Sequence, residues 1–240
     1  MLKTILISLF VFSFASISIA QKFTWLNTGG GTQQDRATFV EVDKEGNSVV
    51  AGNFRSSATF GSTTLTSAGF DDLFVGKYDN VGEIIWILQI GGIGNDEVRG
   101  LCVDDSGNVY VSLYWASSSA TSIRAGDSVF GISTTSASNV LLFKFNPNGE
   151  LPIFLNRCDG GLYVEGGALD IDGQNIIWCV SPRTNLRVYH NNDSLPNPFL
   201  PPWCSGSSCL TGFAVIRLDT AGELRAIKYY SAIATAHEVT

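Results

Sequence analysis

The residues best suited to chemistry in this sequence are clustered acids. Residues 104–108, DDSGN, and residues 170–173, DIDG, each place two carboxylates beside a glycine. Closely spaced carboxylates on a glycine turn suit a hard cation such as Ca²⁺. Neither stretch completes a calcium loop with a distal glutamate, so a hairpin turn is the favoured interpretation. We therefore expect no cofactor, with calcium as the open alternative.

Catalytic signatures are otherwise missing from the sequence. It contains no HExxH, GxSxG, phosphate-binding loop or CxxC, and its two histidines are His190 and His237. Zinc or serine chemistry would have to depend on one of these two. Glycoside cleavage by paired acids needs carboxylates roughly 5 to 9.5 Å apart in a cleft, whereas nearly all acids here fall at turn positions. No catalytic or metal residue is assigned, and we expect a protein that is not an enzyme.

The five cysteines are odd in number, and a chain of 240 residues is too large to depend on a disulfide framework. Cys204 and Cys209, in WCSGSSC, are the candidate disulfide because a flexible four-residue spacer lets their side chains meet. Cys102 and Cys179 lie in apolar strand patterns, which favours small buried hydrophobes. Cys158 has no obvious partner.

Three cations recur at one position of an internal repeat: Lys77, Lys144 and Arg217. In a ring of repeats they would lie at a common radius and could face an anionic ligand such as a carboxylated glycan. The alternative, which we favour, is that each cation pairs with an acid of a neighbouring repeat.

A long insertion between Pro182 and Gly212 is the candidate recognition loop. It is rich in proline and carries two aromatic residues, Phe199 and Trp203. Insertions in repeat folds collect on one face, and loops carry function. The alternative is that this loop is a rigid cover for a strand edge.

The elements that would position these residues form a repeat. Its copies span approximately residues 25–85, 86–152 and 153–226, and a fourth begins at 227. Each copy holds about four short strands and no amphipathic helix. A four-stranded unit of about 60 residues in tandem is typical of a β-propeller blade. The sequence therefore predicts an all-β, partial propeller over residues 21–240, with a two-sheet sandwich as the alternative.

Glycine marks the turns of each copy. Residues 146–149, NPNG, fit a type I turn followed by a left-handed residue, and Gly82, Gly149 and Gly222 hold the left-handed place. An earlier hairpin turns at D-x-x-G-N, where Gly107 and Asn108 are the turn residues of the second copy. These are structural positions.

Residues 1–20 have the anatomy of a secretory signal, with Lys3, an apolar run and a small-residue ending. We expect cleavage before Gln21, no membrane span afterwards, and a secreted or outer-surface location. The remaining chain has 14 basic and 22 acidic side chains, a balance of −8, so nucleic acid is a poor partner. An extracellular protein or glycan is the expected ligand.

The copies resemble the bacterial β-propeller repeat family SBBP. Its pattern of Gly-Gly, Asp, V-D-x-x-G-N-x-Y-V and D-x-F-V-x-K-Y-D-x-x-G-x-x-x-W is matched by Gly91, Gly92, Asp96, Val103, Asp104, Gly107, Asn108, Tyr110 and Val111, and by Asp72, Phe74, Val75, Lys77, Tyr78, Asp79, Gly82 and Trp86. The third copy departs most, with Ile227 at the place of the terminal tryptophan. The resemblance implies a secreted or cell-surface bacterial protein, often from Bacteroidetes, and a type IX sorting domain that this sequence does not display.

Three copies and the start of a fourth are too few for a ring of ordinary curvature, so we expect Thr240 to be a truncation point, with closure in a homodimer as the less favoured alternative. The oligomeric state is open. The leading hypothesis is a non-catalytic exported propeller module for extracellular binding, adhesion or scaffolding. The alternatives are a propeller carbohydrate-active enzyme with catalytic acids partly in missing blades, and a purely structural module.

Overall fold

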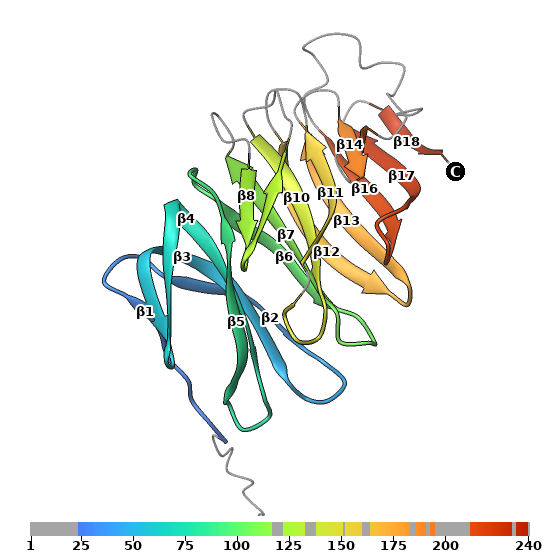
Figure 1. Cartoon of the computed structure of the whole chain (residues 1–240). Coiled ribbons are helices and arrows are strands. Elements are labelled where there is room, and N and C mark those ends of the chain that lie inside the picture. The colour runs from blue at the N-terminus through green and yellow to red at the C-terminus, as the bar shows by residue number, and fades with distance from the viewer. Residues whose placement is uncertain are drawn as a thin grey trace, which may run out of the picture.

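The computed structural model describes residues 24–116, 122–132, 138–150, 152–159, 164–182, 186–190, 193–194, 212–231 and 234–239. Within these ranges all regular structure is β-strand, in three antiparallel sheets, and each of the first two sheets also receives short strands from later in the chain (Figure 1). The prediction of an all-β array of four-stranded blades is confirmed. The described part contains no helix long and apolar enough to cross a membrane.

Each sheet contains a four-stranded antiparallel meander, which we call a blade. Blade 1 consists of β2 (Arg36–Val42), β3 (Ser48–Phe60), β4 (Thr63–Tyr78) and β5 (Ile84–Gly91). Blade 2 consists of β6 (Glu97–Val103), β7 (Val109–Ala116), β10 (Ser138–Phe145) and β11 (Ile153–Asp159). Blade 3 consists of β12 (Val164–Asp172), β13 (Asn175–Pro182), β16 (Gly212–Asp219) and β17 (Leu224–Ser231).

The blades are offset by one strand from the sequence copies. The strand that opens the second copy, at Trp86, is hydrogen-bonded to β4 as the fourth strand of blade 1. The strand that opens the third copy, at Ile153, is likewise the fourth strand of blade 2. Each sequence copy therefore begins with the last strand of the preceding blade. The short strand β1 (Gly29–Gly31) opens the first copy and precedes blade 1.

An insertion between the second and third strands of each blade reaches back to the fourth strand of the preceding unit. In blade 2 the hairpin of β8 (Ser122–Ala125) and β9 (Ser128–Gly131) pairs with β5. In blade 3, β14 (Arg187–His190) pairs with β11 and with β15 (Asp193–Ser194). In blade 1 the extended end of β3 pairs with β1. This repeated backbone pairing fastens successive units at their outer edges. At the far end of the array, β18 (Ala234–Val239) pairs with β17.

The core lies between blades, because strand side chains alternate between the two faces of a sheet. We call the face toward the preceding blade the near face and the opposite one the far face. Leu141 and Phe143 on the near face of blade 2 pack with Leu73 and Val75 on the far face of blade 1. A second cluster fills the junction of blades 2 and 3, where the Trp178 indole donates a 3.0 Å hydrogen bond to the Ser112 hydroxyl.

The hairpin turns have the backbone that their sequences require. Gly82, Gly149 and Gly222 have φ of 88°, 74° and 87°, and Gly107 has φ of 79°. A side chain at Gly149 would be strained there and would also collide with Trp86, since a Cβ would lie 2.5 Å from its ring. The recurring glycines therefore serve both turn geometry and the packing of the preceding fourth strand.

Candidate functional site

The insertion of blade 2 creates an open pocket of about 490 Å³ on the outer edge of the array. Backbone pairing of Ala125 with Ile90 and of Arg124 with Gly91 holds the hairpin against β5, and the Gly126 amide donates to the Gln89 carbonyl at 2.8 Å. Ile123 and Ala125 point into the core, so Arg124 points outward. Alternation along β8 thus anchors the hairpin and presents a cation at the same time.

The lining of this outer pocket mixes apolar and polar groups. Leu65, Ile87 and Pro152 supply apolar surface, and the polar groups are Gln89, Arg124, Asp127 and Glu150. Small-molecule sites of roughly 300 to 1,000 Å³ commonly combine apolar walls with a few orienting polar groups. The arrangement is suited to holding a small polar organic group, such as a sugar unit or a peptide side chain.

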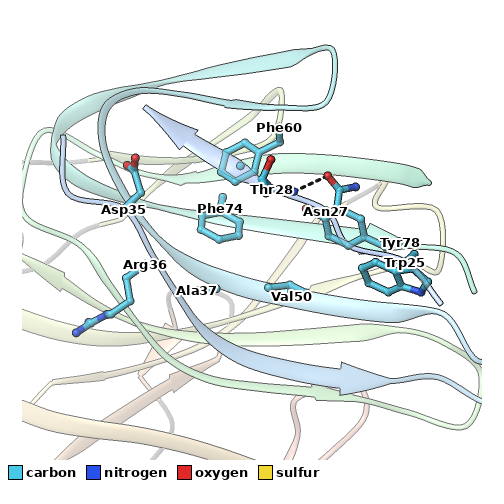
Figure 2. Close-up of a pocket in the computed structure, with 11 residues that line it drawn as sticks. Trp25, Asn27, Thr28, Asp35, Arg36, Ala37, Val50, Phe60, Phe74 and Tyr78 are labelled. Atoms are coloured by element: carbon cyan, nitrogen blue, oxygen red, sulfur yellow. Dashed lines mark hydrogen bonds between the residues drawn. The ribbon is translucent and has the colours of Figure 1, made fainter. Parts of the chain in front are cut away.

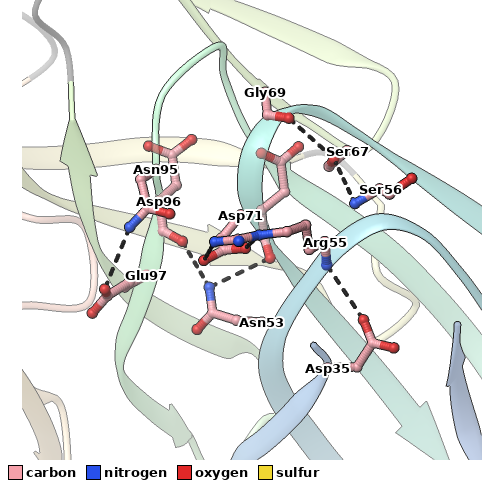
Figure 3. A network of polar contacts seen from close by, with 11 residues as sticks. Asp35, Asn53, Arg55, Ser56, Ser67, Gly69, Asp71, Asn95, Asp96 and Glu97 are labelled. Atoms are coloured by element: carbon pink, nitrogen blue, oxygen red, sulfur yellow. Dashed lines mark hydrogen bonds and ion pairs between the residues drawn. The ribbon is translucent and has the colours of Figure 1, made fainter. Parts of the chain in front are cut away.

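A network of buried amides and acids ties blade 1 to blade 2 (Figure 3). The Asn53 side-chain amide donates to the carbonyl oxygens of Asp96 at 2.7 Å and Asp72 at 3.4 Å, and its oxygen accepts from the Val98 amide at 3.3 Å. The Asp96 amide donates to the Asp71 carbonyl at 2.8 Å. This network joins the second and third strands of blade 1 to the first strand of blade 2 and the residue just before it.

Two buried carboxyls, those of Asp72 and Asp96, have raised pKa values in this network. Asp72 accepts bonds from the Ala68 amide at 2.8 Å and the Gln89 side chain at 2.5 Å, yet burial raises its pKa to about 6. Asp96 accepts from the amides of Gly92 at 2.7 Å and Ala116 at 3.3 Å, and burial together with repulsion from Asp72 raises its pKa to about 7. These carboxyls hold loops in place and are sealed from solvent.

Arg55 and Asp71 lie at the exposed side of the same network. The Arg55 guanidinium donates two hydrogen bonds to the Asp71 carboxylate, at 2.5 and 2.8 Å. The Arg55 amide donates to Asp35 at 3.3 Å (Figure 3). The bidentate pair joins β3 to β4 at a position where the two strands are paired, and it leaves little of the Asp71 carboxylate for a ligand.

The three recurring cations occupy different environments. The Lys77 ammonium is buried, lies 2.8 Å from the Asp43 carboxylate and donates to the Pro147 carbonyl of blade 2 at 3.4 Å. Lys144 donates to the Thr220 carbonyl of blade 3 at 3.1 Å and lies over the ring of Tyr110.

Lys77 and Lys144 therefore each contact a turn of the following blade, through a carbonyl rather than the neighbouring acid that we expected. The partner acid of Lys77 belongs to its own blade. Arg217, in contrast, is exposed. Ligand binding by the three cations stays a prediction. Lys77 and Lys144 could bind a ligand only after breaking these contacts.

The acids of the first calcium candidate form a turn. Asp104 accepts from the amides of Ser106 and Asn108, both at 2.9 Å, from the Asn108 side chain at 2.8 Å and from the Tyr110 hydroxyl at 3.0 Å. In the second candidate, Asp170 accepts from the Ile171 amide at 2.8 Å. Across the described ranges no three His, Cys, Asp or Glu side chains gather as a metal site.

The remaining sulfur and imidazole groups are distributed as follows. Burial raises the pKa of the Cys102 thiol to about 12 and also raises that of Cys179, so both thiols stay protonated and are poor nucleophiles. His190 lies 3.5 Å from the Glu223 carboxylate beside the last turn of blade 3. The signal segment, Phe199, Trp203, Cys204 and Cys209 lie outside the described residues.

Sequence reasoning missed the outer pocket and the buried network. Nothing in the local pattern around Arg124 or Asp127 indicates a pocket, because it forms only when the hairpin folds onto β5. The network left a weak signal, since Asp35 and Asp96 recur four residues after equivalent glycines. That repetition could have identified a loop-fastening carboxyl.

Comparison with known proteins agrees with the fold. Residues 85–112, which run from β5 into β7, match the family model described as a beta-propeller repeat, SBBP. A stretch of 114 residues is 25% identical to an uncharacterized WD repeat-containing protein of Acanthamoeba polyphaga mimivirus, covering 40% of this chain and 8% of that protein. The chain thus spans a small fraction of that relative. The described residues of this chain form an all-β array of propeller blades, and one of the repeats matches the SBBP model.

Proposed function

We propose that this chain is an exported, non-catalytic propeller module that binds an extracellular ligand through its insertions. The observation that carries the proposal is the outer pocket, which lies between the hairpin of β8 and β9 and the strands of the blade frame. A frame fastened by core packing and backbone pairing can hold such insertions in fixed positions, and exposed loops on rigid scaffolds are where binding residues concentrate.

The chemistry of the pocket favours a hydroxyl- or carboxylate-bearing ligand. Arg124 is exposed and offers planar hydrogen-bond donors, and Asp127 is an exposed acceptor on the same hairpin. Several other acids are used for turns and blade contacts, as Asp43, Asp96 and Asp104 show. Binding without cleavage is therefore the better supported activity.

A glycan and extracellular-protein panel tests this proposal. The natively exported protein is immobilised, and retained ligands and newly formed reducing ends are measured in parallel. We expect retention without new ends, and at least a tenfold loss of retention in the Arg124→Ala and Asp127→Ala variants. The control is Lys44→Ala, which removes an exposed cation from a turn between β2 and β3.

Each other outcome contradicts a different part of the proposal. New reducing ends would indicate a carbohydrate-active enzyme. Retention that survives both pocket substitutions would exclude the outer pocket as the site. No retention by any probe would favour a purely structural module.

Export, a bacterial surface location and type IX sorting also belong to the proposal. They are supported by the residues of the N-terminal segment and the repeat resemblance. N-terminal sequencing of the exported protein is expected to begin at Gln21, whereas an N-terminus at Met1 would contradict a cleaved signal.

A further inference from the structure

The outer edge of β5 borders the outer pocket. Ile87, Leu88 and Gln89 line the pocket in succession. Ile87 packs with the cluster that contains Phe74, on the near face of blade 1, whereas Leu88 packs with the cluster that contains Val75, on the far face. The pocket therefore extends across both sides of the strand edge, and a ligand within it would meet the backbone of β5 as well as its side chains.

β5 has backbone groups without a strand partner at this edge. The Gln89 carbonyl points outward, because it accepts a 2.8 Å hydrogen bond from the Gly126 amide of the hairpin. Backbone groups two residues apart point to the same edge of a strand, so the amide and carbonyl of Ile87 point outward as well. β8 pairs with β5 only at Ile90 and Gly91, and the described residues place no strand beside Ile87. One donor and one acceptor are therefore available there.

The three blades differ in how their outer strands are protected. Three residues after the turn glycine, they carry Ile85, Pro152 and Arg225 in chain order. A proline or a charged side chain on an edge strand discourages pairing with another chain. Blade 1 has neither at this position, and its Ile85 is 49% exposed. The strand that borders the outer pocket is thus the least protected of the three against strand addition.

Three elements surround this part of the edge. They are the extended arm of β4 at Leu65, the hairpin tip at Gly126 and Asp127, and the turn of blade 2 at Glu150 and Pro152. Because the β4 arm lies on the near side of the edge and blade 2 on the far side, the space suits one extended chain. The edge of a second folded sheet would collide with these elements, which argues against a second copy of this array as the occupant.

We propose that the outer edge of β5 binds an extended segment of a partner protein as an additional β-strand, with one side chain of that segment in the outer pocket. In this mode of recognition, main-chain hydrogen bonds supply affinity and side-chain pockets supply specificity. The inference rests on the proposed ligand-binding function, since it uses the same pocket, and it narrows the ligand to a protein.

The lining of the outer pocket indicates which side chain would enter it. Leu65, Ile87 and Pro152 suit an apolar stem. Arg124 and Asp127 suit a polar end that can both accept and donate a hydrogen bond. A long side chain with a neutral polar end, such as that of tyrosine or glutamine, has both features.

A smaller pocket of about 200 Å³ lies over the near face of blade 1 (Figure 2). Its walls include the aromatic rings of Trp25, Phe74 and Tyr78. None of the described residues that line it belongs to β5. Substitutions on β5 therefore distinguish a peptide bound at the outer edge from one bound in this smaller pocket.

Selection from a phage-displayed library of random short peptides tests the proposal on the natively exported protein. We expect retained peptides whose binding falls at least tenfold when alternate backbone amides are N-methylated, because N-methylation removes the donors of a strand ladder. Binding should fall similarly in Ile85→Arg and Ile85→Pro, which introduce the residues of blades 3 and 2. The β4–β5 register skips Ile85, since Lys77 pairs with Trp86 and Tyr78 with Ile84, so neither change removes a ladder pair.

The matched control is Ile93→Arg. Ile93 is 58% exposed in the loop that follows β5, so this substitution adds the same charge away from the proposed edge and should leave binding unchanged. Amide hydrogen exchange gives a second readout in the unsubstituted protein. The Ile87 amide should exchange at least tenfold more slowly with the selected peptide than without it, and equal rates would contradict strand addition.

The remaining outcomes separate this inference from the proposed function. Binding that survives N-methylation and both Ile85 substitutions, but is lost in Arg124→Ala, would overturn strand addition and keep the outer pocket as a ligand site. Binding lost in Trp25→Ala instead would assign the peptide to the smaller pocket and overturn the inference. Retention of glycans without any peptide would overturn it in favour of a glycan ligand. Retention of no probe would overturn both the inference and the proposed function.

Discussion

Val40 and Leu101 occupy the same place in successive blades, yet their exposed fractions are 64% and 3%. The two strands share their spacing to the following turn and their alternation, and each pairs with a second strand in the same register. The difference lies in the neighbour, because the near face of blade 2 packs against the far face of blade 1, whereas no blade of the described residues packs against the near face of blade 1. In a stacked array, burial is thus decided by the adjacent unit and not by the strand itself.

The polar residues show the same contrast. Asp35 and Asp96 each accept a bond from a glycine amide and another from the amide that follows a second-strand aromatic residue. Asp96 is fully buried between blades 1 and 2, and Asp35 is half-buried beside the near face of blade 1. The two carboxyls therefore accept the same kinds of hydrogen bond but differ in burial. We expect the stability of the junction between blades 1 and 2, and not that of the near face of blade 1, to depend strongly on pH.

The largest effect is expected for the buried ion pair of the covered junction. Lys77→Met leaves the Asp43 carboxylate buried without its counter-ion, and breaking such a pair costs about 3 to 5 kcal/mol of unfolding free energy. Burial raises the pKa of Asp43, but bonds from Lys77 and Asn47 outweigh this and hold it below its usual value.

Chemical denaturation measures the loss. The matched control is Lys144→Met, which removes a bond to a carbonyl and a contact with Tyr110 but strands no acid. Equal losses in the two variants would contradict the importance of the Lys77–Asp43 pair.

The two equivalent apolar residues, Leu101 and Val40, should give the next largest difference in unfolding free energy. Leu101→Ala is expected to cost about 2 to 5 kcal/mol, as for buried aliphatic truncations. Val40→Ala should change the free energy of unfolding by about 0.5 kcal/mol or less if its surroundings stay open. Urea denaturation of both variants checks this. A large cost at Val40 would show that the near face of blade 1 is covered in solution.

The pH dependence of the unfolding free energy should come from the junction of blades 1 and 2. Because the pKa of Asp72 is raised to about 6 and that of Asp96 to about 7, the folded state binds extra protons. The stabilisation is fully present below the unfolded value near 4 and is lost as pH rises through 6 and 7. Asp72→Asn removes one of these groups and keeps an acceptor for Ala68 and Gln89.

We expect the variant to lose less stability than the natural protein between pH 4.5 and 8, by at most about 3 kcal/mol. Denaturation midpoints across this range provide the measurement. Asp105→Asn, at an exposed acid, is the control. Parallel curves for Asp72→Asn and the natural protein would contradict the linkage.

The smallest effect belongs to an exposed contact across the same junction. Lys44 and Asp105 form a 2.9 Å ion pair between the turns of blades 1 and 2, with both side chains more than half exposed. Lys44→Ala should cost about 0 to 1 kcal/mol, and 0.5 M salt should abolish the difference. A loss similar to that of Lys77→Met would show that burial is not what separates the two pairs.

Much of the architecture could be predicted because it depends on local chemistry. The glycines at 82, 149 and 222 need positive φ, and the D-x-x-G-N turn needs an aspartate that accepts amide bonds, so spacing alone locates both hairpins of a blade. The outer pocket, the Asn53 contacts and the partners of Lys77 could not be predicted, because each joins residues tens of positions apart.

By itself, the sequence determined the strand-rich repeat, the turn positions and the blade-like unit of four strands, since these follow from side-chain alternation and the φ preferences of glycine. The tertiary structure alone decided to which blade each strand belongs, which acids are buried and which sheet face is exposed. Those properties arise from packing between units, where the same residue at the same strand position is covered or exposed according to its neighbour. Val40 and Leu101 differ for that reason.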